Sequence, residues 1–154
     1  MLSDLEKNEI QKELELFPFR SAVCIDALKI VQRERGWISD EAVRDIASHL
    51  LLTSDEVDAV ATFYTRIYRK PVGRNVILVC EGISCMIMGY ETLCNRLSEK
   101  LGIRFGETTP DNRFTLLPVS CLGDCDHAPV MMINDDTYNN VVLTEIELIL
   151  EKYM

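Results

Sequence analysis

The chain has 154 residues, of which 47% are apolar and 27% are charged. This balance is typical of a globular protein and excludes a disordered chain, a collagen and a coiled-coil rod. Asp and Glu together number 25 while Lys and Arg number 16, so the net charge is −9. Because an acidic chain without a Lys/Arg cluster binds phosphate groups poorly, we expect neither nucleic acid nor an anionic membrane surface as a partner.

The N-terminal sequence MLSDLEKNEI has no basic stretch followed by an apolar run, so no signal peptide is expected. The longest apolar runs are about five residues, far shorter than the ~20 residues of a membrane-spanning helix. We therefore expect a soluble intracellular protein without membrane insertion. In a reducing compartment, its 6 cysteines are expected to be metal ligands or reactive thiols rather than disulfides.

Residues 1–70 have the pattern of short amphipathic helices joined by brief loops. Ser3 and Glu6 have the spacing of a capping box, in which two side chains satisfy free N–H groups at the start of a helix. Gly36 can adopt the left-handed conformation that ends a helix. These signals predict a small bundle whose helices begin near Ser3, Ser21, Ser39 and Thr53.

The apolar stripe of the fourth helix continues from Val57 to Tyr68 at helical spacing. Its aromatic residues, Phe63, Tyr64 and Tyr68, are therefore expected in the core rather than against a cofactor. The sequence Pro71-Val-Gly73 then marks a junction. We expect a helical bundle domain at 1–70 and a second domain at 71–154.

Residues 71–154 alternate between strand and helix patterns. Apolar runs at 76–80, 114–119 and 128–135 predict strands, and the segment 86–101 predicts a helix. Thr144 and Glu147 have capping-box spacing and predict a last helix. The order β-α-β-β-α is compatible with a thioredoxin-like α/β domain, so the chain is expected to be an α+β protein.

Two cysteine pairs follow two of the predicted strands. Cys80 ends the first strand and precedes Cys85 by five positions, whereas Cys121 follows the second strand and precedes Cys125 by four. If the two strands are neighbours, both loops leave the same edge of the sheet. The four thiolates can then converge on one metal centre.

Both zinc and iron–sulfur centres accept four thiolates. Structural zinc sites commonly use tighter C-x2-C pairs, so the wider spacings here favour a [2Fe–2S] cluster, in which each pair binds one iron. A structural zinc module and a thiol–disulfide enzyme remain as alternatives. The absence of a C-x-x-C pair disfavours the enzyme.

Other features have simpler interpretations. Cys24 and Cys94 lie in apolar helical patterns and are expected to be small buried residues rather than functional thiols. Gly82 and Gly123 lie in the ligand loops, where glycine lets backbone N–H groups approach sulfur. The sequence assigns no role to His127 or Trp37.

Several segments together resemble the E subunits of bacterial NADH:quinone oxidoreductase, the enzyme also called respiratory complex I. These subunits are of the 24-kilodalton type. The resemblance covers nearly the whole chain and depends on the combination of segments. They are ALKIVQRERGWIS (27–39), VDAVATFY (57–64), RKPVGRNVI (69–77), the pair at 80 and 85, FTLLPVSCLGDC (114–125) and APVMMIND (128–135).

The resemblance implies a helical segment followed by a thioredoxin-like domain that carries one 2Fe–2S cluster near the FMN of the NADH-binding F subunit. It implies a place among the subunits of the peripheral arm, on the cytoplasmic side of the inner membrane. Related domains occur in NAD-linked hydrogenases and formate dehydrogenases, which leaves a diaphorase module as an alternative host. The ligands implied by position are Cys80, Cys85, Cys121 and Cys125.

The chain has no glycine-rich dinucleotide fingerprint after a strand. We therefore expect NADH and FMN to bind only in the partner protein, and the isolated chain to have no catalytic activity. NADH delivers two electrons together as a hydride, and a flavin can pass them on singly to a cluster.

Overall fold

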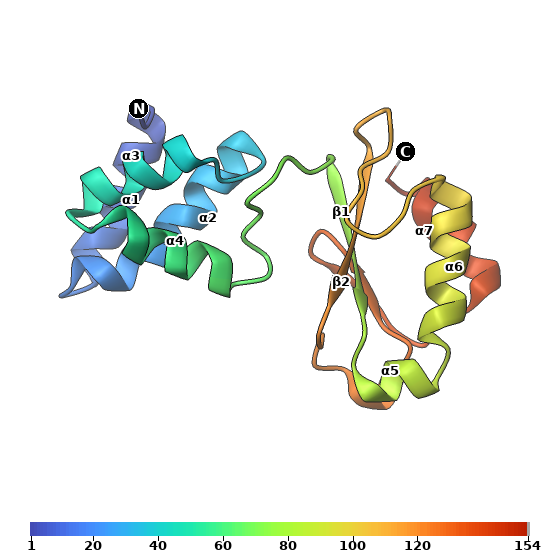
Figure 1. Cartoon of the computed structure of the whole chain (residues 1–154). Coiled ribbons are helices and arrows are strands. Elements are labelled where there is room, and N and C mark those ends of the chain that lie inside the picture. Colours follow the sequence, from blue (N-terminus) through green and yellow to red (C-terminus); the bar gives the residue numbers. More distant parts are fainter. Residues whose placement is uncertain (154) are drawn as a thin grey trace. The chain divides into compact units, whose positions relative to one another are not determined.

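The structure is a computed structural model that describes residues 1–153. The chain forms two compact units, Met1–Pro71 and a second unit that begins at Val72 (Figure 1). Each unit has its own hydrophobic core.

The first unit is a small helical bundle, and local sequence signals determine where its helices begin and end. Capping boxes form at Ser3 with Glu6 and at Thr53 with Glu56. Gly36 has a φ of 81° and ends the second helix in the left-handed conformation. The elements are α1 (Asp4–Leu16), η1 (Arg20–Val23), α2 (Cys24–Arg35), α3 (Asp40–Leu50) and α4 (Ser54–Phe63).

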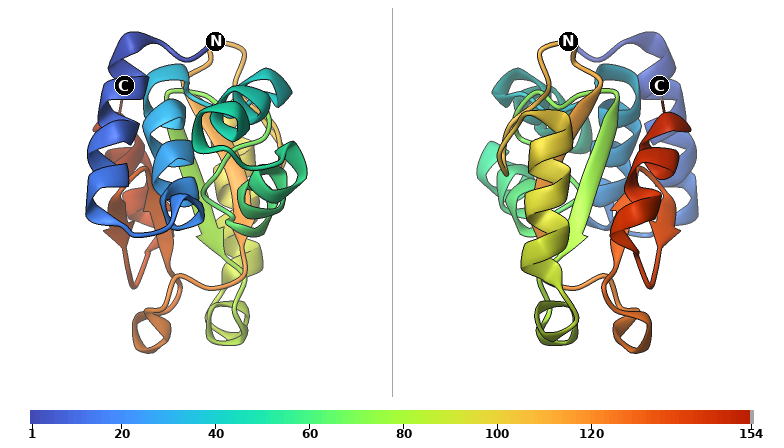
Figure 2. Two further views of the ribbon diagram at one scale, coloured as in Figure 1. Left: turned by 90° about the vertical axis from the view of Figure 1, so that its left-hand side faces the viewer. Right: turned by 90° about the vertical axis from the view of Figure 1, so that its right-hand side faces the viewer.

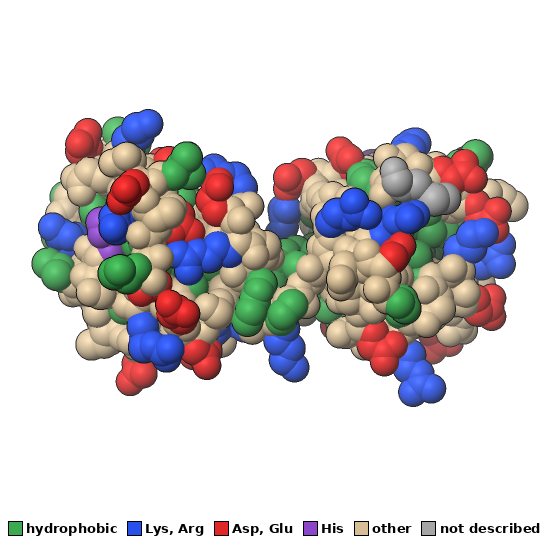
Figure 3. Space-filling view, turned by 90° about the horizontal axis from the view of Figure 1, so that it is seen from above, with side chains coloured by type: hydrophobic (Ala, Val, Ile, Leu, Met, Phe, Trp, Pro, Cys, Tyr) green, Lys and Arg blue, Asp and Glu red, His purple; other side chains and the backbone are tan. Residues whose placement is uncertain are grey.

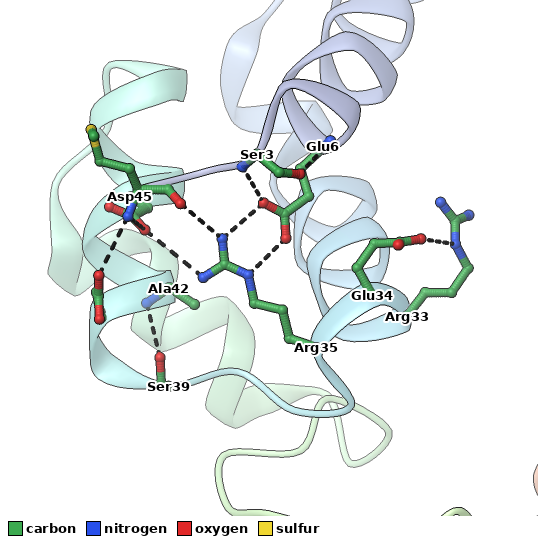
Figure 4. A network of polar contacts seen from close by, with 10 residues as sticks. Ser3, Glu6, Arg33, Glu34, Arg35, Ser39, Ala42 and Asp45 are labelled. Carbon is green, nitrogen blue, oxygen red and sulfur yellow. Dashed lines mark hydrogen bonds and ion pairs between the residues drawn. The ribbon is translucent and has the colours of Figure 1, made fainter.

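A buried ion pair joins α1 to α2 (Figure 4). The Glu6 side chain is only 2% exposed, and the Arg35 guanidinium donates to its two oxygens at 2.7 and 2.8 Å. The backbone N–H of Ser3 donates to the same carboxylate at 2.7 Å. Arg35 also lies 3.9 Å from Asp45 of α3. A buried carboxylate is tolerated when it is paired in this way, so the network fixes three helices relative to one another.

The fourth helix is shorter than the sequence predicts, and the expectation of core positions for Phe63 and Tyr64 is wrong. The helix ends at Phe63, and Tyr64 has an extended backbone. Phe63 is 77% exposed and Tyr64 is 45% exposed, with the two rings packed edge to face against each other. Once the helix ends, its period no longer determines which side chains point inward, and Ile67 is buried instead.

The second unit contains a mixed sheet with the strand order β2-β1-β3-β4. The first two strands in the chain pair in parallel, and the later strands are antiparallel. Helices α6 (Tyr90–Leu101) and α7 (Ile146–Glu151) cover one face of this sheet (Figures 1 and 2). The strands are β1 (Asn75–Cys80), β2 (Phe114–Val119), β3 (Met131–Ile133) and β4 (Asp136–Tyr138).

The structure departs from three predicted elements of this unit, and single backbone angles explain the first two. The helix expected at 86–101 is divided into α5 (Ile83–Ile87) and α6 by Gly89, whose φ is 115°. The segment 128–135 is not one strand, because Asn134 adopts a φ of 54° and turns the chain into the unpredicted β4. The last helix has no side-chain cap and follows the 3-10 turn η3 (Leu143–Glu145).

Among the helices of residues 1–153, none has the length and apolar character needed to cross a bilayer.

Candidate metal centre

The two predicted ligand loops leave the sheet side by side. Parallel pairing of β1 with β2 places Cys80 opposite Val119, so both strands end at the same edge. The backbone N–H of Glu81 donates to the Val119 carbonyl at 2.9 Å, and that of Cys80 donates to the Val130 carbonyl at 3.1 Å. The condition for convergence, that the two strands be neighbours, is therefore met.

The four cysteines of these loops lie together at that edge. Cys80 is the last residue of β1 and Cys85 lies in α5, and both are buried. Cys121 follows β2 and Cys125 begins the 3-10 turn η2 (Cys125–His127), and both are exposed. The structure therefore forms a sulfur site with one buried pair and one pair near the surface.

Contacts between the sulfur atoms link the two pairs. The Sγ atoms of Cys121 and Cys125 are 3.8 Å apart. The thiol of Cys80 interacts with Cys85, whose pKa it helps to raise, and with Cys121, whose pKa it helps to lower. Cys80 is thus the residue through which the buried pair meets the exposed pair.

The surroundings of the sulfurs differ in their effect on ionisation. The backbone N–H of Gly123 donates to the Cys121 Sγ at 3.3 Å and lowers the pKa of Cys121, and the contact with Cys125 lowers it further. Burial raises the pKa of Cys85. Since metals bind the thiolate form, the contact with the Gly123 N–H favours ligation by Cys121.

The spacing of the sulfurs distinguishes a mononuclear from a binuclear centre. Four thiolates around one zinc, each at ~2.3 Å, would place every pair of sulfurs about 3.8 Å apart. Within the described part of the chain, no three of these four sulfurs lie within 4.8 Å of one another. The four sulfurs do not form the single tight group that one zinc ion needs, so the site suits two metal ions better than one, and thiolate donors suit an iron–sulfur cluster.

The exposed ligand loop is tied to the segment after β4. Asp124 accepts from the Asn139 amide at 3.0 Å and contacts Nδ1 of His127 at 2.5 Å. The backbone N–H of Asn140 donates to the His127 carbonyl at 2.7 Å. The ion pair lowers the pKa of Asp124 and raises that of His127. Asn139 cannot be recognised from the sequence, because no local pattern shows which loop lies beside the ligands.

The remaining cysteines lie outside this site. Cys24 of α2 is 3% exposed and Cys94 of α6 is 8% exposed, which confirms their prediction as buried residues. Burial raises the pKa of both thiols, and Cys94 also contacts the Tyr90 side chain. Neither cysteine belongs to the group of four at the edge of the sheet.

Comparisons with known proteins match most of the chain. Residues 10–154 match the family model described as thioredoxin-like [2Fe-2S] ferredoxin. The E subunit of NADH-quinone oxidoreductase from Buchnera aphidicola subsp. Acyrthosiphon pisum is 47% identical, over 99% of this chain and 94% of the relative. The E subunit from Pseudomonas aeruginosa is 45% identical, over 100% of this chain and 93% of the relative.

Among solved structures, an NAD⁺-reducing [NiFe]-hydrogenase in the H2-reduced state is similar with a TM-score of 0.69 and 25% identity. The match covers 82% of this chain but only 22% of the hydrogenase chain. The similarity places the same fold within a much longer oxidoreductase chain.

These matches confirm the predicted α+β fold with its thioredoxin-like domain and the single 2Fe–2S cofactor. They also confirm the predicted role as an electron-transfer subunit of an NADH-oxidising complex. The chain belongs to the thioredoxin-like [2Fe-2S] ferredoxin family and, within it, to the E subunits of NADH-quinone oxidoreductase.

Proposed function

We propose that two cysteine pairs of this chain hold its 2Fe–2S cluster, through which the protein takes up single electrons from the flavin of a partner. The observation that supports this most strongly is the convergence of both pairs at one edge of the parallel strands β1 and β2. When bound, a cluster of this kind supplies one-electron redox chemistry. The proposed ligands are Cys80, Cys85, Cys121 and Cys125.

The protein around the sulfurs has two tasks in this proposal. Buried Cys80 and Cys85, packed with Ala128 and Val130, exclude water from the inner side of the site. A Cβ atom at Gly82 would lie 3.4 Å from the Cys80 Sγ and 3.3 Å from the Ser120 carbonyl oxygen, so glycine leaves the sulfur its space. On the outer side, the N–H of Gly123 stabilises negative charge on sulfur.

The flavin and NADH are proposed to reside in the F subunit, against which this chain packs in the peripheral arm on the cytoplasmic side of the membrane. The similarity over nearly the full length to the E subunits of Buchnera aphidicola and Pseudomonas aeruginosa supports membership of such a complex. We also propose that the two compact units are the predicted domains, 1–70 and 71–154. Their separate cores support this division.

A diaphorase module of an NAD-linked hydrogenase or formate dehydrogenase is the second candidate host. The similarity to the NAD⁺-reducing hydrogenase supports this second host. That chain is only 25% identical to this one, however, whereas the Buchnera E subunit is 47% identical. A zinc scaffold is disfavoured because, among the residues that the structure describes, no three of the four sulfurs lie within 4.8 Å of one another.

Co-purification tests the proposed partner. The chain should be isolated from its source organism under mild conditions, and the complex analysed for FMN and for its subunits. We expect an FMN-containing F subunit at equal stoichiometry. Recovery with a hydrogenase or a formate dehydrogenase instead would support the second candidate, and recovery without any flavoprotein would contradict both.

Replacing Asn139 by alanine should loosen the ligand loop, because Asp124 loses its amide partner on the segment after β4. We expect the variant to lose its cluster roughly tenfold faster in the presence of a chelator, as is typical when a supporting contact is removed. The decay of visible absorbance measures this rate. The matched control is Asn95→Ala at an exposed position of α6, which should decay like the parent.

A further inference from the structure

A small cavity lies at the end of the second unit opposite the sulfur site. Strands β1 and β2 both begin at this end, and helix α6 ends there (Figure 1). The cavity has a volume of about 340 Å³, within the range of about 300 to 1,000 Å³ that is usual for small-molecule sites. Most of its surface is apolar, and its apolar walls come from Leu101, Pro110, Phe114 and Leu150.

The turn before β2 forms one wall of the cavity and is held by its own hydrogen bonds. The Oγ1 of Thr109, a residue only 8% exposed, donates to Oδ1 of Asp111 at 2.6 Å. The same hydroxyl accepts from the backbone N–H of Phe114 at 3.0 Å. The backbone N–H of Arg113 donates to Oδ1 of Asp111 at 3.0 Å. Because these bonds fix the turn in advance, a ligand would not have to order it on binding.

Two cations, Lys100 and Arg113, also line the cavity. The Nε of Arg113 is shielded from solvent and lies 3.2 Å from Oδ2 of Asp111. Among the residues that the structure describes, the two Nη groups of Arg113 have no hydrogen-bond or ion-pair partner. A guanidinium that is held at Nε keeps its Nη groups for a planar carboxylate, which it binds through parallel N–H···O bonds.

The charges around the cavity favour an anion that carries a single charge. Lys and Arg side chains gather at this end of the second unit (Figure 3). Lys100 is already paired with Glu147 at 2.9 Å, and Arg113 with Asp111. A doubly charged phosphate would be repelled by both of these carboxylates, whereas a single carboxylate needs only the unpaired Nη groups of Arg113.

We propose that this cavity binds a small organic acid, with its apolar body against Leu101, Phe114 and Leu150 and its carboxylate on the Nη groups of Arg113. Burial of the apolar body supplies most of the affinity, and the ion pair selects acids over neutral molecules. The cavity is separate from the sulfur site, because β1 and β2 begin at one and end at the other. The inference therefore goes beyond the proposed function and does not depend on it.

The test titrates the cluster-loaded full chain with phenylacetate and follows the methyl NMR signals of Leu101 and Leu150. We expect both signals to shift and to reach saturation, because both side chains line the cavity. Phenylacetamide has nearly the same shape without the charge, and it should bind roughly tenfold or more weakly. Absence of a saturable shift with phenylacetate, or equal binding of the two probes, would overturn the proposal.

A pair of variants tests the role of Arg113. Arg113→Gln should weaken the binding of phenylacetate roughly tenfold or more and leave that of phenylacetamide unchanged. The matched control is Arg104→Gln, which removes the same charge from an exposed position outside the lining of the cavity. It should bind phenylacetate within about twofold of the parent, because an exposed charge is screened by salt. Parent-like binding of phenylacetate by Arg113→Gln, equal weakening of both probes, or an equal loss in Arg104→Gln would overturn the proposal.

Discussion

Replacing Cys121 by serine should remove most of the bound iron from the purified protein. Its sulfur lies 3.8 Å from that of Cys125 and accepts the N–H of Gly123, so the change removes one of the four thiolates of the proposed centre together with this contact. A serine hydroxyl is a harder donor than a thiolate and is a poor ligand for a cluster. Iron and sulfide analysis, with the spectrum of the reduced protein, measures the loss.

Cys94→Ser is the matched control for this experiment. Cys94 lies on α6, 8% exposed and in contact with Tyr90, and it is not part of the sulfur site. The variant should keep the iron content and reduced-state spectrum of the parent. Equal loss of iron from both variants would show that the ligand assignment is wrong.

Replacing Glu6 by glutamine should lower the free energy of unfolding of the helical unit by on the order of 3 kcal/mol at pH 7. Glu6 is 2% exposed and paired with Arg35, so the change leaves a guanidinium without its main anionic partner. The effect is at the low end for buried pairs because Arg35 still reaches Asp45 and solvent. Chemical denaturation followed by circular dichroism measures the difference.

The difference in free energy of unfolding between the parent and Glu6→Gln should decrease as the pH is lowered. The Arg35 guanidinium holds the pKa of Glu6 below its ordinary value of 4.5 in the folded state. The stabilisation is therefore complete above about pH 4.5 and disappears as the pH falls through the lower folded-state pKa. Parent and variant should converge in acid. The matched control is Glu15→Gln, at an exposed position of α1, which should alter the free energy of unfolding by less than about 0.5 kcal/mol at any pH. If Glu15→Gln destabilised the protein as much as Glu6→Gln, the assigned role of the buried ion pair would be contradicted.

Local signals made much of the fold predictable. Capping boxes at Ser3 and Thr53 and the left-handed Gly36 act over a few residues, and each determines a helix end directly. The proposed four-cysteine site was predicted from the spacing of the cysteines and from the apolar strand that precedes each pair. The predicted convergence also required the two strands to be neighbours, which the parallel pairing of β1 and β2 satisfies.

The features that escaped prediction depend on contacts between distant segments or on single backbone angles. Asn134 turns the chain into β4 through a φ of 54°, which a non-glycine residue seldom adopts. Phe63 and Tyr64 continue a helical pattern beyond the point where the helix ends. Asn139 supports the ligand loop across 15 positions of sequence, so only the fold reveals its role.

The central claim is that two cysteine pairs hold a binuclear iron–sulfur centre, and metal analysis of the purified full-length protein tests it most directly. We predict equal amounts of iron and acid-labile sulfide, about two of each per chain, and a paramagnetic signal that appears only on reduction. A colourless protein that holds one zinc ion per chain, with neither iron nor sulfide, would contradict the account.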